Sequence, residues 1–262
     1  MKKIFFVSLF ICSVLSISAQ TVVDFSQYFK EYDLEGGFFL YDYKAKTYKV
    51  SDKADFVRAT SPASTFKIPN SLIALEVGAI KDENEVLKWD GEKRWLPVWD
   101  KDHNLTEAYK NSTVWFYQGL ARRIGKKNYT KYLKACDYGN KDISGGLTQF
   151  WLGNSLKISP KNQLEFMKRL YEEKLPFSKR TFEITKRIMV HEQTNDYILR
   201  AKTGMATVDK IDIGWFVGYV EKKDNAYFFA LRMQKPEAKQ MPEFASRRIE
   251  ITTKILKQMG II

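Results

Sequence analysis

Metal-binding and redox residues are scarce in this sequence, which contains two cysteines and two histidines among 262 residues. A structural zinc site usually takes four cysteine or histidine ligands. The segment that follows His191 also lacks the second histidine of a zinc-protease helix. Cys12 falls in an N-terminal segment that we expect to be removed, so Cys136 would be alone, and we interpret it as a small buried side chain. We therefore predict neither a metal site nor an internal disulfide.

Membrane spans and phosphate loops are missing as well. Beyond the N-terminus no apolar run approaches the roughly 20 residues that cross a bilayer, and no glycine-rich loop of a nucleotide site is present. Residues 1–19 have a basic start, an apolar middle and a small-residue end, which is typical of a signal peptide. We predict cleavage before Gln20, a periplasmic or secreted mature protein, and no integral membrane segment.

Charge of both signs is plentiful, with 43 lysines and arginines against 31 aspartates and glutamates. The formal net charge of +12 becomes +10 when Lys2 and Lys3 leave with the signal peptide. Such a balance suits nucleic acid or an anionic polymer, but the basic residues are scattered among acidic ones and form no long tract. We interpret them as solvated helix faces and predict no nucleic-acid partner.

Ser64 and Lys67 stand three residues apart at the start of an apolar run. On a helix these two side chains share a face. A serine hydroxyl needs a base within hydrogen-bond reach to act as a nucleophile, and the Lys67 amine is a candidate for that base. We predict a helix that ends at Gly78 and has Ser64 in its first turn, where the helix dipole lowers the energy of negative charge. The alternative is a capped core helix without chemistry.

Two further motifs lie downstream of this pair. Ser112 precedes an apolar-periodic segment, and Lys202-Thr203-Gly204 ends another. The pairing of S-x-x-K with K-T-G marks serine acyl-transfer enzymes. On a strand edge beside the nucleophile, the lysine and hydroxyl can hold a substrate carboxylate while a backbone N–H faces the reacting carbonyl. These motifs therefore predict acyl transfer.

The chain resembles the class D (oxacillinase-type) serine β-lactamases in five motifs that follow in the same order over most of the mature chain. The five motifs are Ser64-Thr65-Phe66-Lys67, Ser112-Thr113-Val114, Tyr138-Gly139-Asn140, Gln149-Phe150-Trp151-Leu152 and Lys202-Thr203-Gly204. The resemblance implies hydrolysis of β-lactam antibiotics, both penicillins and oxacillin-type compounds, through a serine acyl-enzyme that confers antibiotic resistance. The partner would be a small-molecule β-lactam, and both a monomer and a homodimer stay open.

The resemblance assigns the general base to Lys67. In this family the corresponding lysine takes up carbon dioxide, supplied as such or as bicarbonate, to become N6-carboxylysine, and no other cofactor is implied. Only a neutral amine reacts in this way, and an apolar shell from Val114, Trp151 and Leu152 would lower the lysine pKa. Trp151 would donate its indole N–H to the carbamate. Ordinary core packing is the alternative role of that tryptophan.

Other matching positions would move protons or hold the substrate carboxylate. The resemblance makes Ser112 a proton relay between the general base, Lys202 and the leaving nitrogen of the β-lactam. Thr203 and Arg248 would bind the carboxylate, because a guanidinium forks onto it in a bidentate way. The neighbouring Arg247 is the alternative to Arg248.

The oxyanion hole implied by the resemblance consists of the backbone N–H groups of Ser64 and Met205, with Gly204 between the latter and the lysine motif. Tyr138 and Asn140 would shape the floor of the site, and a simple turn is their alternative role. Met205 departs from the family, in which an aromatic residue is frequent at this position. A flexible thioether lines a pocket differently from a rigid ring, so this departure bears on substrate preference.

We predict one α/β domain over residues 20–262, with residues 1–19 as the signal peptide. An antiparallel sheet flanked by helices would use both ends of the chain, and a mainly helical lobe near residues 70–190 would be inserted into it, as in the serine β-lactamase and penicillin-binding transpeptidase fold. The site should lie where the two parts meet. The expected elements are strands over residues 37–43, 47–51, 213–221 and 226–233, and helices over residues 23–32 and 244–259.

Two rival functions use the same motifs. A β-lactam-sensing, penicillin-binding domain would be acylated but would not turn over, although such sensors hang from a multi-span membrane segment that this sequence lacks. A penicillin-binding transpeptidase or carboxypeptidase would pass its acyl group to peptidoglycan. The combination of Tyr138, Asn140 and Trp151 disfavours this second rival.

Overall fold

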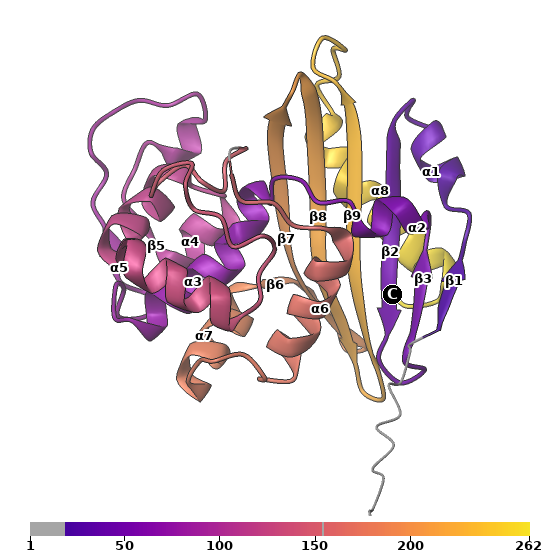
Figure 1. Cartoon of the computed structure of the whole chain (residues 1–262), viewed down its shortest axis with the longest axis horizontal. Helices are drawn as coiled ribbons and strands as arrows, with labels where there is room; N and C mark the ends of the chain where they lie inside the picture. The colour runs from indigo at the N-terminus through magenta and orange to yellow at the C-terminus, as the bar shows by residue number, and fades with distance from the viewer. Residues whose placement is uncertain (1–18, 154) are drawn as a thin grey trace, which may run out of the picture.

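The computed structural model centres on one seven-stranded sheet with helices on both faces (Figure 1). It describes residues 19–153 and 155–262, so the predicted signal peptide lies outside the described residues except for Ala19. The elements are β1 (Gln20–Val22), α1 (Ser26–Lys30), β2 (Glu35–Asp42), β3 (Thr47–Val50), α2 (Lys53–Val57), the 3₁₀ helix η1 (Ala63–Phe66), α3 (Lys67–Glu76), β4 (Val86–Leu87), the 3₁₀ helix η2 (Pro97–Trp99), β5 (His103–Asn104), α4 (Leu105–Lys110), α5 (Val114–Ala135), α6 (Pro160–Tyr171), α7 (Lys179–Ile188), β6 (Val190–Gln193), β7 (Tyr197–Val208), β8 (Ile211–Lys222), β9 (Ala226–Pro236) and α8 (Phe244–Gln258). The predicted α/β architecture is confirmed.

Strands from the two ends of the chain meet in the middle of the sheet, whose order is β1-β3-β2-β9-β8-β7-β6. The strand β2 runs antiparallel to both β3 and β9, with Leu40 opposite Phe229 in the central pair. The long strands β7, β8 and β9 form an antiparallel meander. Both predicted hairpins are therefore present. No pattern in the sequence predicts β1, which pairs in parallel with β3, or β6 at the opposite edge.

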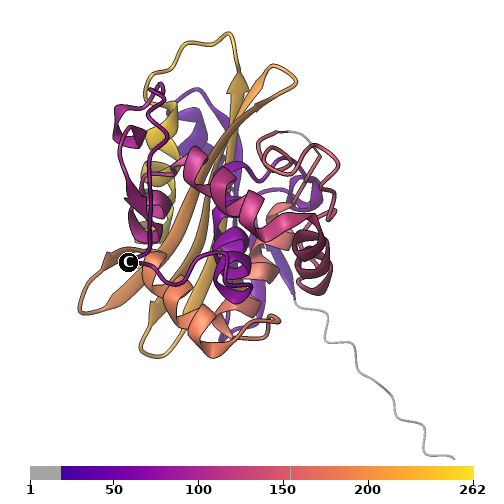
Figure 2. The ribbon, with the colours of Figure 1, turned by 90° about the vertical axis from the view of Figure 1, so that its left-hand side faces the viewer.

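The helical lobe, formed by α3, α4, α5 and α7 with the small β4–β5 pair, lies beside the β7 end of the sheet (Figures 1 and 2). Local side chains fix where its helices begin. Asn104 and Glu107 form a capping box at α4, and the Ser178 hydroxyl accepts a hydrogen bond from the Thr181 N–H at the start of α7. Helix α5 is interrupted at Gly125, whose φ of 76° only glycine adopts readily. The predicted helical insertion is thus confirmed.

The sheet separates two apolar clusters. On one face α1 and α8 pack against strand residues such as Phe38 and Leu231, and Ile255 of α8 is fully buried among them. On the other face α6 and the helical lobe bury a larger cluster that includes Phe66 and Trp151. Helix α8 appears behind the sheet in Figure 1, whereas α6 lies in front of it. The second cluster is the one that surrounds the predicted site.

Two helix boundaries differ from the predictions. The helix expected over residues 23–32 is confined to α1, because the Val23 N–H still donates to the Val50 carbonyl of β3 at 2.9 Å. Asp33 adopts a positive φ of 51° in the turn that follows the helix. Ser64 lies in the 3₁₀ turn η1 that precedes α3, not in the first turn of an α-helix. The residue before it, Ala63, has a φ of 48°, and this left-handed conformation prevents the α-helix from starting earlier. The helix α3 ends as predicted, with Gly78 at a φ of 69° just beyond it.

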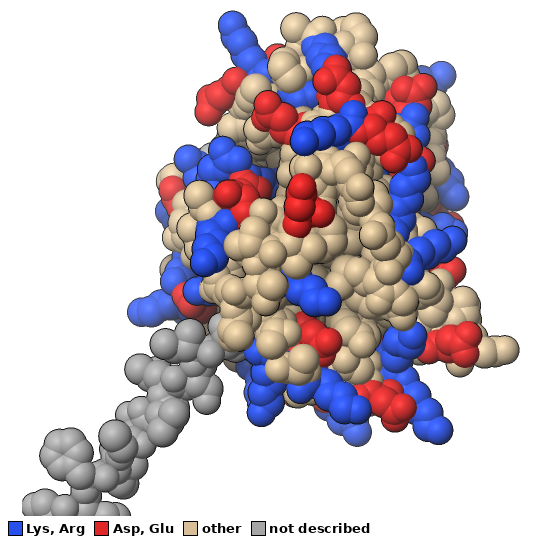
Figure 3. Space-filling model, turned by 90° about the vertical axis from the view of Figure 1, so that its right-hand side faces the viewer, with Lys and Arg blue, Asp and Glu red and all other residues tan. Residues whose placement is uncertain are grey.

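The charged surface is mixed. Figure 3 shows lysine and arginine side chains interspersed with acidic ones over one face of the molecule. Many charged side chains form ion pairs, such as Arg187 with Glu83 and Lys254 with Glu31. This pattern agrees with solvated helix faces. Within the described ranges no helix is both long and apolar enough to span a bilayer.

Candidate functional site

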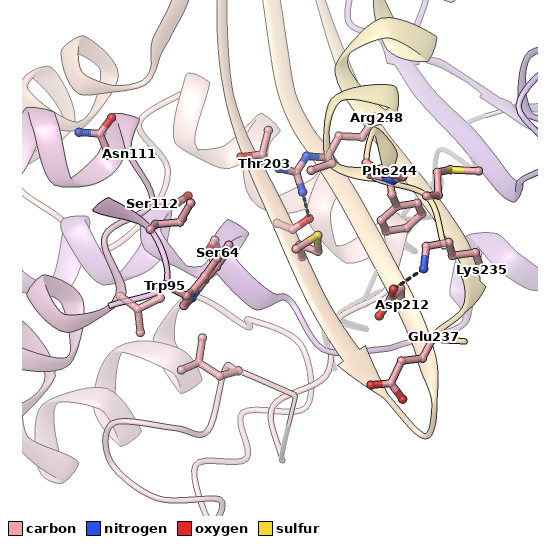
Figure 4. Close-up of a pocket in the computed structure, with 18 of the residues that line it drawn as sticks. Ser64, Trp95, Asn111, Ser112, Thr203, Asp212, Lys235, Glu237, Phe244 and Arg248 are labelled. Atoms are coloured by element: carbon pink, nitrogen blue, oxygen red, sulfur yellow. Dashed lines mark hydrogen bonds and ion pairs between the residues drawn. The ribbon is translucent and has the colours of Figure 1, made fainter. Parts of the chain in front are cut away.

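A cleft of about 840 Å³ opens where η1, the α4–α5 turn, β7 and the start of α8 approach one another (Figure 4). Most of the predicted substrate-contacting residues line it. Those at its wall are Ser64, Ser112, Val114, Leu152, Thr203, Gly204, Met205 and Arg248. Lys67, Trp151 and Lys202 are buried in the layer behind this wall. The site therefore lies at the junction of the sheet and the helical lobe, as predicted.

Ser64 and Lys67 are hydrogen-bonded. The 3₁₀ turn places the Lys67 amine 2.8 Å from the Ser64 hydroxyl oxygen. Thr65 stabilises the turn from behind, since its hydroxyl donates to the carbonyl of Pro62 at 2.7 Å. Gln163 of α6 in turn donates to the Thr65 hydroxyl at 2.9 Å. The candidate nucleophile thus has an amine within reach and a rigid support.

Lys67 is fully buried, and burial lowers the pKa of its amine to about 7. None of the acidic side chains in the described part of the chain forms an ion pair with it. Its ammonium lies 5.1 Å from the centre of the Tyr117 ring. Near neutral pH a large fraction of this amine is therefore unprotonated and able to act as a base or a nucleophile.

A second buried amine lies beside the second serine. Lys202 donates to the Ser112 hydroxyl at 2.5 Å and to the Thr203 hydroxyl at 3.1 Å, and it lies over the Tyr109 ring. Burial is the main cause that lowers the pKa of Lys202 well below its usual value, and the charges of Lys67 and Arg248 add to it. Two hydroxyl–amine pairs thus share one site, in which the amines are buried and the hydroxyls line the cleft.

The lysine motif lies on an open edge of the sheet. Pairing between β6 and β7 ends at Arg200, so the following residues of β7 have β8 as their strand partner on one side only. The free side approaches η1 closely. A Cβ atom at Gly204 would lie 3.0 Å from the Pro62 carbonyl oxygen and 3.0 Å from Thr65 Cγ2. Glycine at this position is what lets the strand backbone come so near the Ser64 turn.

Trp151 is packed as a core residue and has one unpaired polar atom. Its ring is fully buried and stacks on Phe66, with the ring centroids 5.5 Å apart. Its indole N–H nevertheless has no hydrogen-bond partner among the described residues. An unpaired buried donor costs about 1–3 kcal/mol, so it calls for an acceptor. This donor is the feature of Trp151 that core packing alone does not explain.

The two neighbouring arginines differ clearly in position. Arg248 lines the cleft, donates to the Gly204 carbonyl at 2.7 Å and has an Nε without a partner among the described residues. Burial lowers the pKa of its guanidinium to about 10, so it remains charged. Arg247 instead forms an ion pair with Glu250 and lies over the Tyr32 ring. The geometry favours Arg248 as the group that faces an anionic ligand.

Tyr138 and Asn140 do not line the cleft, so their predicted contact with substrate is indirect. Tyr138 is buried and packs edge-on against Phe66. Asn140 accepts from the backbone N–H of Lys157 at 2.9 Å and donates to the carbonyl of Ser155 at 2.8 Å. The sequence motif therefore marks a support that closes a loop beneath the site.

Sequence reasoning missed four side chains of this region. Tyr117 and Tyr109 lie beneath the two buried amines, and Gln163 supports the Ser64 turn. Trp95 lines the mouth of the cleft. The two tyrosines stand in apolar-periodic segments, where they cannot be told from core residues. Neither Gln163 nor Trp95 belongs to a motif that marks it.

Metal ligands do not gather anywhere in residues 19–153 and 155–262, since no group of three or more histidine, cysteine, aspartate or glutamate side chains has a suitable arrangement. His103 is buried with its Nε2 3.1 Å from the Val98 carbonyl. Cys136 is buried, and burial raises the pKa of its thiol to about 12. The predicted site residues supply hydroxyls, amines and a guanidinium.

Comparison with known proteins points to one family. Residues 32–257 match the family model described as the penicillin binding protein transpeptidase domain. The β-lactamase OXA-48 of Klebsiella pneumoniae is 48% identical over 205 residues, which cover 78% of this chain and 76% of that protein. The crystal structure of a class D β-lactamase from Sebaldella termitidis superposes with a TM-score of 0.89 at 42% identity, covering 94% of this chain and all of that one.

A receptor domain is also similar. The C-terminal domain of the Bacillus licheniformis BlaR penicillin-receptor superposes with a TM-score of 0.88 at 34% identity, covering 94% of this chain and 98% of that one. The fold and the overall similarity are thus shared between hydrolases and a penicillin receptor.

Proposed function

The chain belongs to the penicillin-binding transpeptidase-domain family and within it to the class D β-lactamases, which are serine hydrolases, and from this premise we propose that it hydrolyses penicillins and oxacillin-type β-lactams through a Ser64 acyl-enzyme. Lys67, as N6-carboxylysine, is the general base in this proposal. Hydrolysis of these compounds would confer antibiotic resistance. The observation that carries the proposal is the contact of the Ser64 hydroxyl with a fully buried lysine whose pKa is near 7.

Acylation begins at Ser64. As its oxygen forms a bond to the β-lactam carbonyl carbon, its proton passes to the Lys67 side chain, with which it is hydrogen-bonded. The negative charge that develops on the carbonyl oxygen is stabilised by the backbone N–H groups of Ser64 and Met205. When the carbon–nitrogen bond of the ring breaks, the nitrogen takes a proton from the Ser112 hydroxyl. The proton that Lys67 accepted from Ser64 replaces it by way of the Lys202 amine, which is hydrogen-bonded to Ser112, so that both lysine side chains return to their starting states.

Deacylation requires a base that can activate water beside the ester. A carbamate on Lys67 would supply an oxygen base with a reach longer than that of the amine. The residues that would hold it are Trp151, through its unpaired indole N–H, and the apolar side chains of Val114 and Leu152 that exclude water. Water then attacks the ester carbon, the proton returns to Ser64, and the opened product leaves.

Thr203 and Arg248 bind the substrate carboxylate in this proposal. Both line the same wall of the cleft, and the Arg248 guanidinium is charged and mostly buried, so its attraction for an anion is weakly screened. Lys202 adds a donor beside the Thr203 hydroxyl. This cationic wall suits penicillins, which carry a carboxylate next to the reactive ring.

A penicillin receptor is the second candidate, favoured by the similarity to the BlaR domain. In that function Ser64 would be acylated and the ester would persist. Both candidates share every step up to the acyl-enzyme, so only the rate of ester hydrolysis separates them. A transpeptidase would likewise acylate but would pass the acyl group to an amine.

We further propose that residues 1–19 are a cleavable signal peptide and that residues 20–262 form a single domain, exported to the periplasm or secreted. The basic start, apolar middle and small-residue end of the segment support this proposal. Determination of the N-terminal residue of the exported protein tests it, with Gln20 as the expected first residue.

The decisive experiment is a penicillin hydrolysis time course with purified residues 20–262 in buffer freed of carbon dioxide, with and without added bicarbonate. Sustained turnover that bicarbonate strengthens supports the hydrolase with a carboxylated Lys67. A stoichiometric burst that bicarbonate does not prolong supports the receptor. Turnover that is equal in both buffers contradicts the role of the carbamate while leaving β-lactam hydrolysis in place.

A further inference from the structure

An exposed tryptophan stands at the mouth of the cleft. Large hydrophobic side chains are exposed at only a few described positions, and of these Trp95 and Met205 line the cleft. Trp95 is 73% exposed, the highest fraction among them. Tryptophan usually buries most of its ring, because each ring offers roughly 150–250 Å² of contact area. An exposed tryptophan beside a reactive serine is therefore a candidate contact for substrate.

Arg94, the residue before Trp95, holds the surrounding segment, residues 88–102, in place. Arg94 donates to both carboxylate oxygens of Asp90, at 2.8 and 2.6 Å, and to the Glu92 carbonyl at 2.7 Å. Its guanidinium also lies over the Trp115 ring, and its backbone N–H donates to Asp100. The backbone next to Trp95 is thus held in place before any ligand arrives.

Trp99 supports one edge of the exposed ring. The two indoles meet in a T-shaped contact with centroids 5.5 Å apart. Trp99 is buried, and its N–H donates to the carbonyl of Asn111 at 2.9 Å, next to Ser112. The position of Trp95 is therefore coupled to the segment that carries the second serine of the site. The part of the Trp95 ring that does not contact Trp99 faces solvent and the cleft.

The chemistry around Trp95 selects a ligand that is both apolar and anionic. Met205, which is 45% exposed, offers a flexible thioether that also lines the cleft, and sulfur makes favourable contacts with aromatic rings. Lys110 and Arg248 add positive charge to the lining of the cleft. In Figure 4 the labels of Trp95 and Ser64 lie together on the helical-lobe side of the cleft, facing Thr203 and Arg248.

We propose that Trp95 is a specificity-determining residue that packs against a planar aromatic substituent of the β-lactam. The proposal rests on the proposed function and names a substrate class within it: carboxylate-bearing β-lactams with an aryl group on one of their side arms. A contact between two aromatic rings strengthens binding about two- to tenfold beyond the area that it buries. The rigid support from Arg94 and Trp99 means that little order must be gained on binding.

The test compares matched substrates. Two pairs are used: penicillins with a phenylacetyl or an acetyl side chain, and cephalosporins whose 3-substituent is an aryl or a methyl group. The wild type, Trp95→Ala, Trp95→Phe and Val98→Ala are measured on all four compounds. Val98 is the matched control, because it is exposed in the same segment but does not line the cleft.

The readout is the aryl-to-alkyl ratio of kcat/KM. We expect Trp95→Ala to lower this ratio at least about fivefold in one of the pairs, Trp95→Phe to keep most of it, and Val98→Ala to leave it unchanged. A ratio that stays constant in both pairs while all rates fall together shows that Trp95 only supports the loop, and it overturns the proposal. The same holds if no variant changes any rate.

The same experiment distinguishes failure of the proposed hydrolase function from failure of the proposal for Trp95. If the wild type is acylated by the alkyl compounds but does not release them, the hydrolase is excluded. The ratio is then taken from the rate constants of acylation, and the proposal for Trp95 is accepted or rejected on those alone.

Discussion

The two faces of the sheet are built from different materials. The face covered by α1 and α8 holds an apolar cluster in which Leu231 and Ile255 are fully enclosed. The face covered by the helical lobe encloses Lys67 and Lys202, together with polar donors that lack partners among the described residues, such as the Trp151 indole. Apolar burial on the first face stabilises the fold. On the second face the buried amines and unpaired donors are destabilising, and the stability of the rest of the fold offsets this cost.

The buried amine of Lys67 makes the free energy of unfolding depend on pH. The pKa of Lys67 falls from 10.5 to about 7 on folding, so between these values the unfolded chain binds more protons than the folded chain. Stability therefore rises with pH through this window, and the destabilising contribution is complete below pH 7. A gap of this size corresponds to at most roughly 5 kcal/mol.

The largest expected effect tests whether chemistry is confined to the polar face. Ser64→Ala should abolish covalent labelling by penicillin and reduce hydrolysis at least about 10³-fold, because it removes the nucleophile. Its melting temperature should stay close to that of the wild type. Mass spectrometry after incubation with penicillin measures the adduct. A covalent adduct on the variant would show that a residue other than Ser64 reacts with penicillin, and would contradict the assignment of the nucleophile.

Lys67→Met should remove turnover and make the fold more stable. The stabilisation should reach several kcal/mol at pH 6 and shrink toward pH 10, since the variant has no buried amine to protonate. Urea unfolding in buffer freed of carbon dioxide, at both pH values, measures it. Lys179→Met on the exposed face of α7 serves as the control and should show no such trend. If each of the three proteins were equally stable at both pH values, burial of Lys67 would not make the stability of the fold depend on pH.

Ile255→Ala probes the apolar face. Truncation of a fully buried isoleucine costs about 2–5 kcal/mol of unfolding free energy. The kcat of the folded fraction should remain that of the wild type, because Ile255 lies across the sheet from the site. Denaturant unfolding combined with active-site titration separates the two quantities. A drop in kcat per active site would show that the faces are not independent.

Trp151→Phe sharpens the contrast within the polar face. Phenylalanine keeps the stack on Phe66 but lacks the indole N–H. Loss of one hydrogen bond to a charged group should slow deacylation about 10–100-fold and acylation less. Pre-steady-state kinetics distinguish the two steps. If deacylation were unchanged, the assignment of Trp151 as donor to the carbamate would be wrong.

The smallest expected effect is the response of turnover to pH. With a Lys67 pKa of about 7, the neutral fraction of the amine falls about tenfold between pH 8 and pH 6. Carbamate formation, and with it kcat, should fall in parallel, and bicarbonate should restore less activity at pH 6 than at pH 8. A flat profile over this range would indicate that Lys67 is held in one protonation state.

The sequence predicts the sheet well where hydrophobic alternation is strong. The hairpins β2–β3 and β8–β9 and the helix α8 all lie where their patterns place them. It does not predict β1, because three exposed residues carry no alternation and pair only through backbone groups. The motifs also predict which residues gather at the cleft, including Ser64, Lys67 and Lys202.

What the motifs leave out is the support of those residues. Tyr117 contributes to the burial of Lys67 only through a packing arrangement that no spacing rule expresses. Trp95 lies at the cleft because residues far along the chain form the rest of the cleft lining. Nothing in its own segment marks it as part of a site. Roles carried by single side chains in tertiary contacts leave no periodic trace in the sequence.

The central position of the β2–β9 pair has a consequence for a chain that is cut. Glu35 and Gln234, which are 199 positions apart, are hydrogen-bonded across this pair, and they are the first of eight residue pairs along it. Every link of the helical lobe lies between these strands in the sequence. A protease that nicks a loop of the lobe therefore produces two fragments that remain joined through the sheet, so that a break in the covalent chain does not by itself separate the two halves of the molecule.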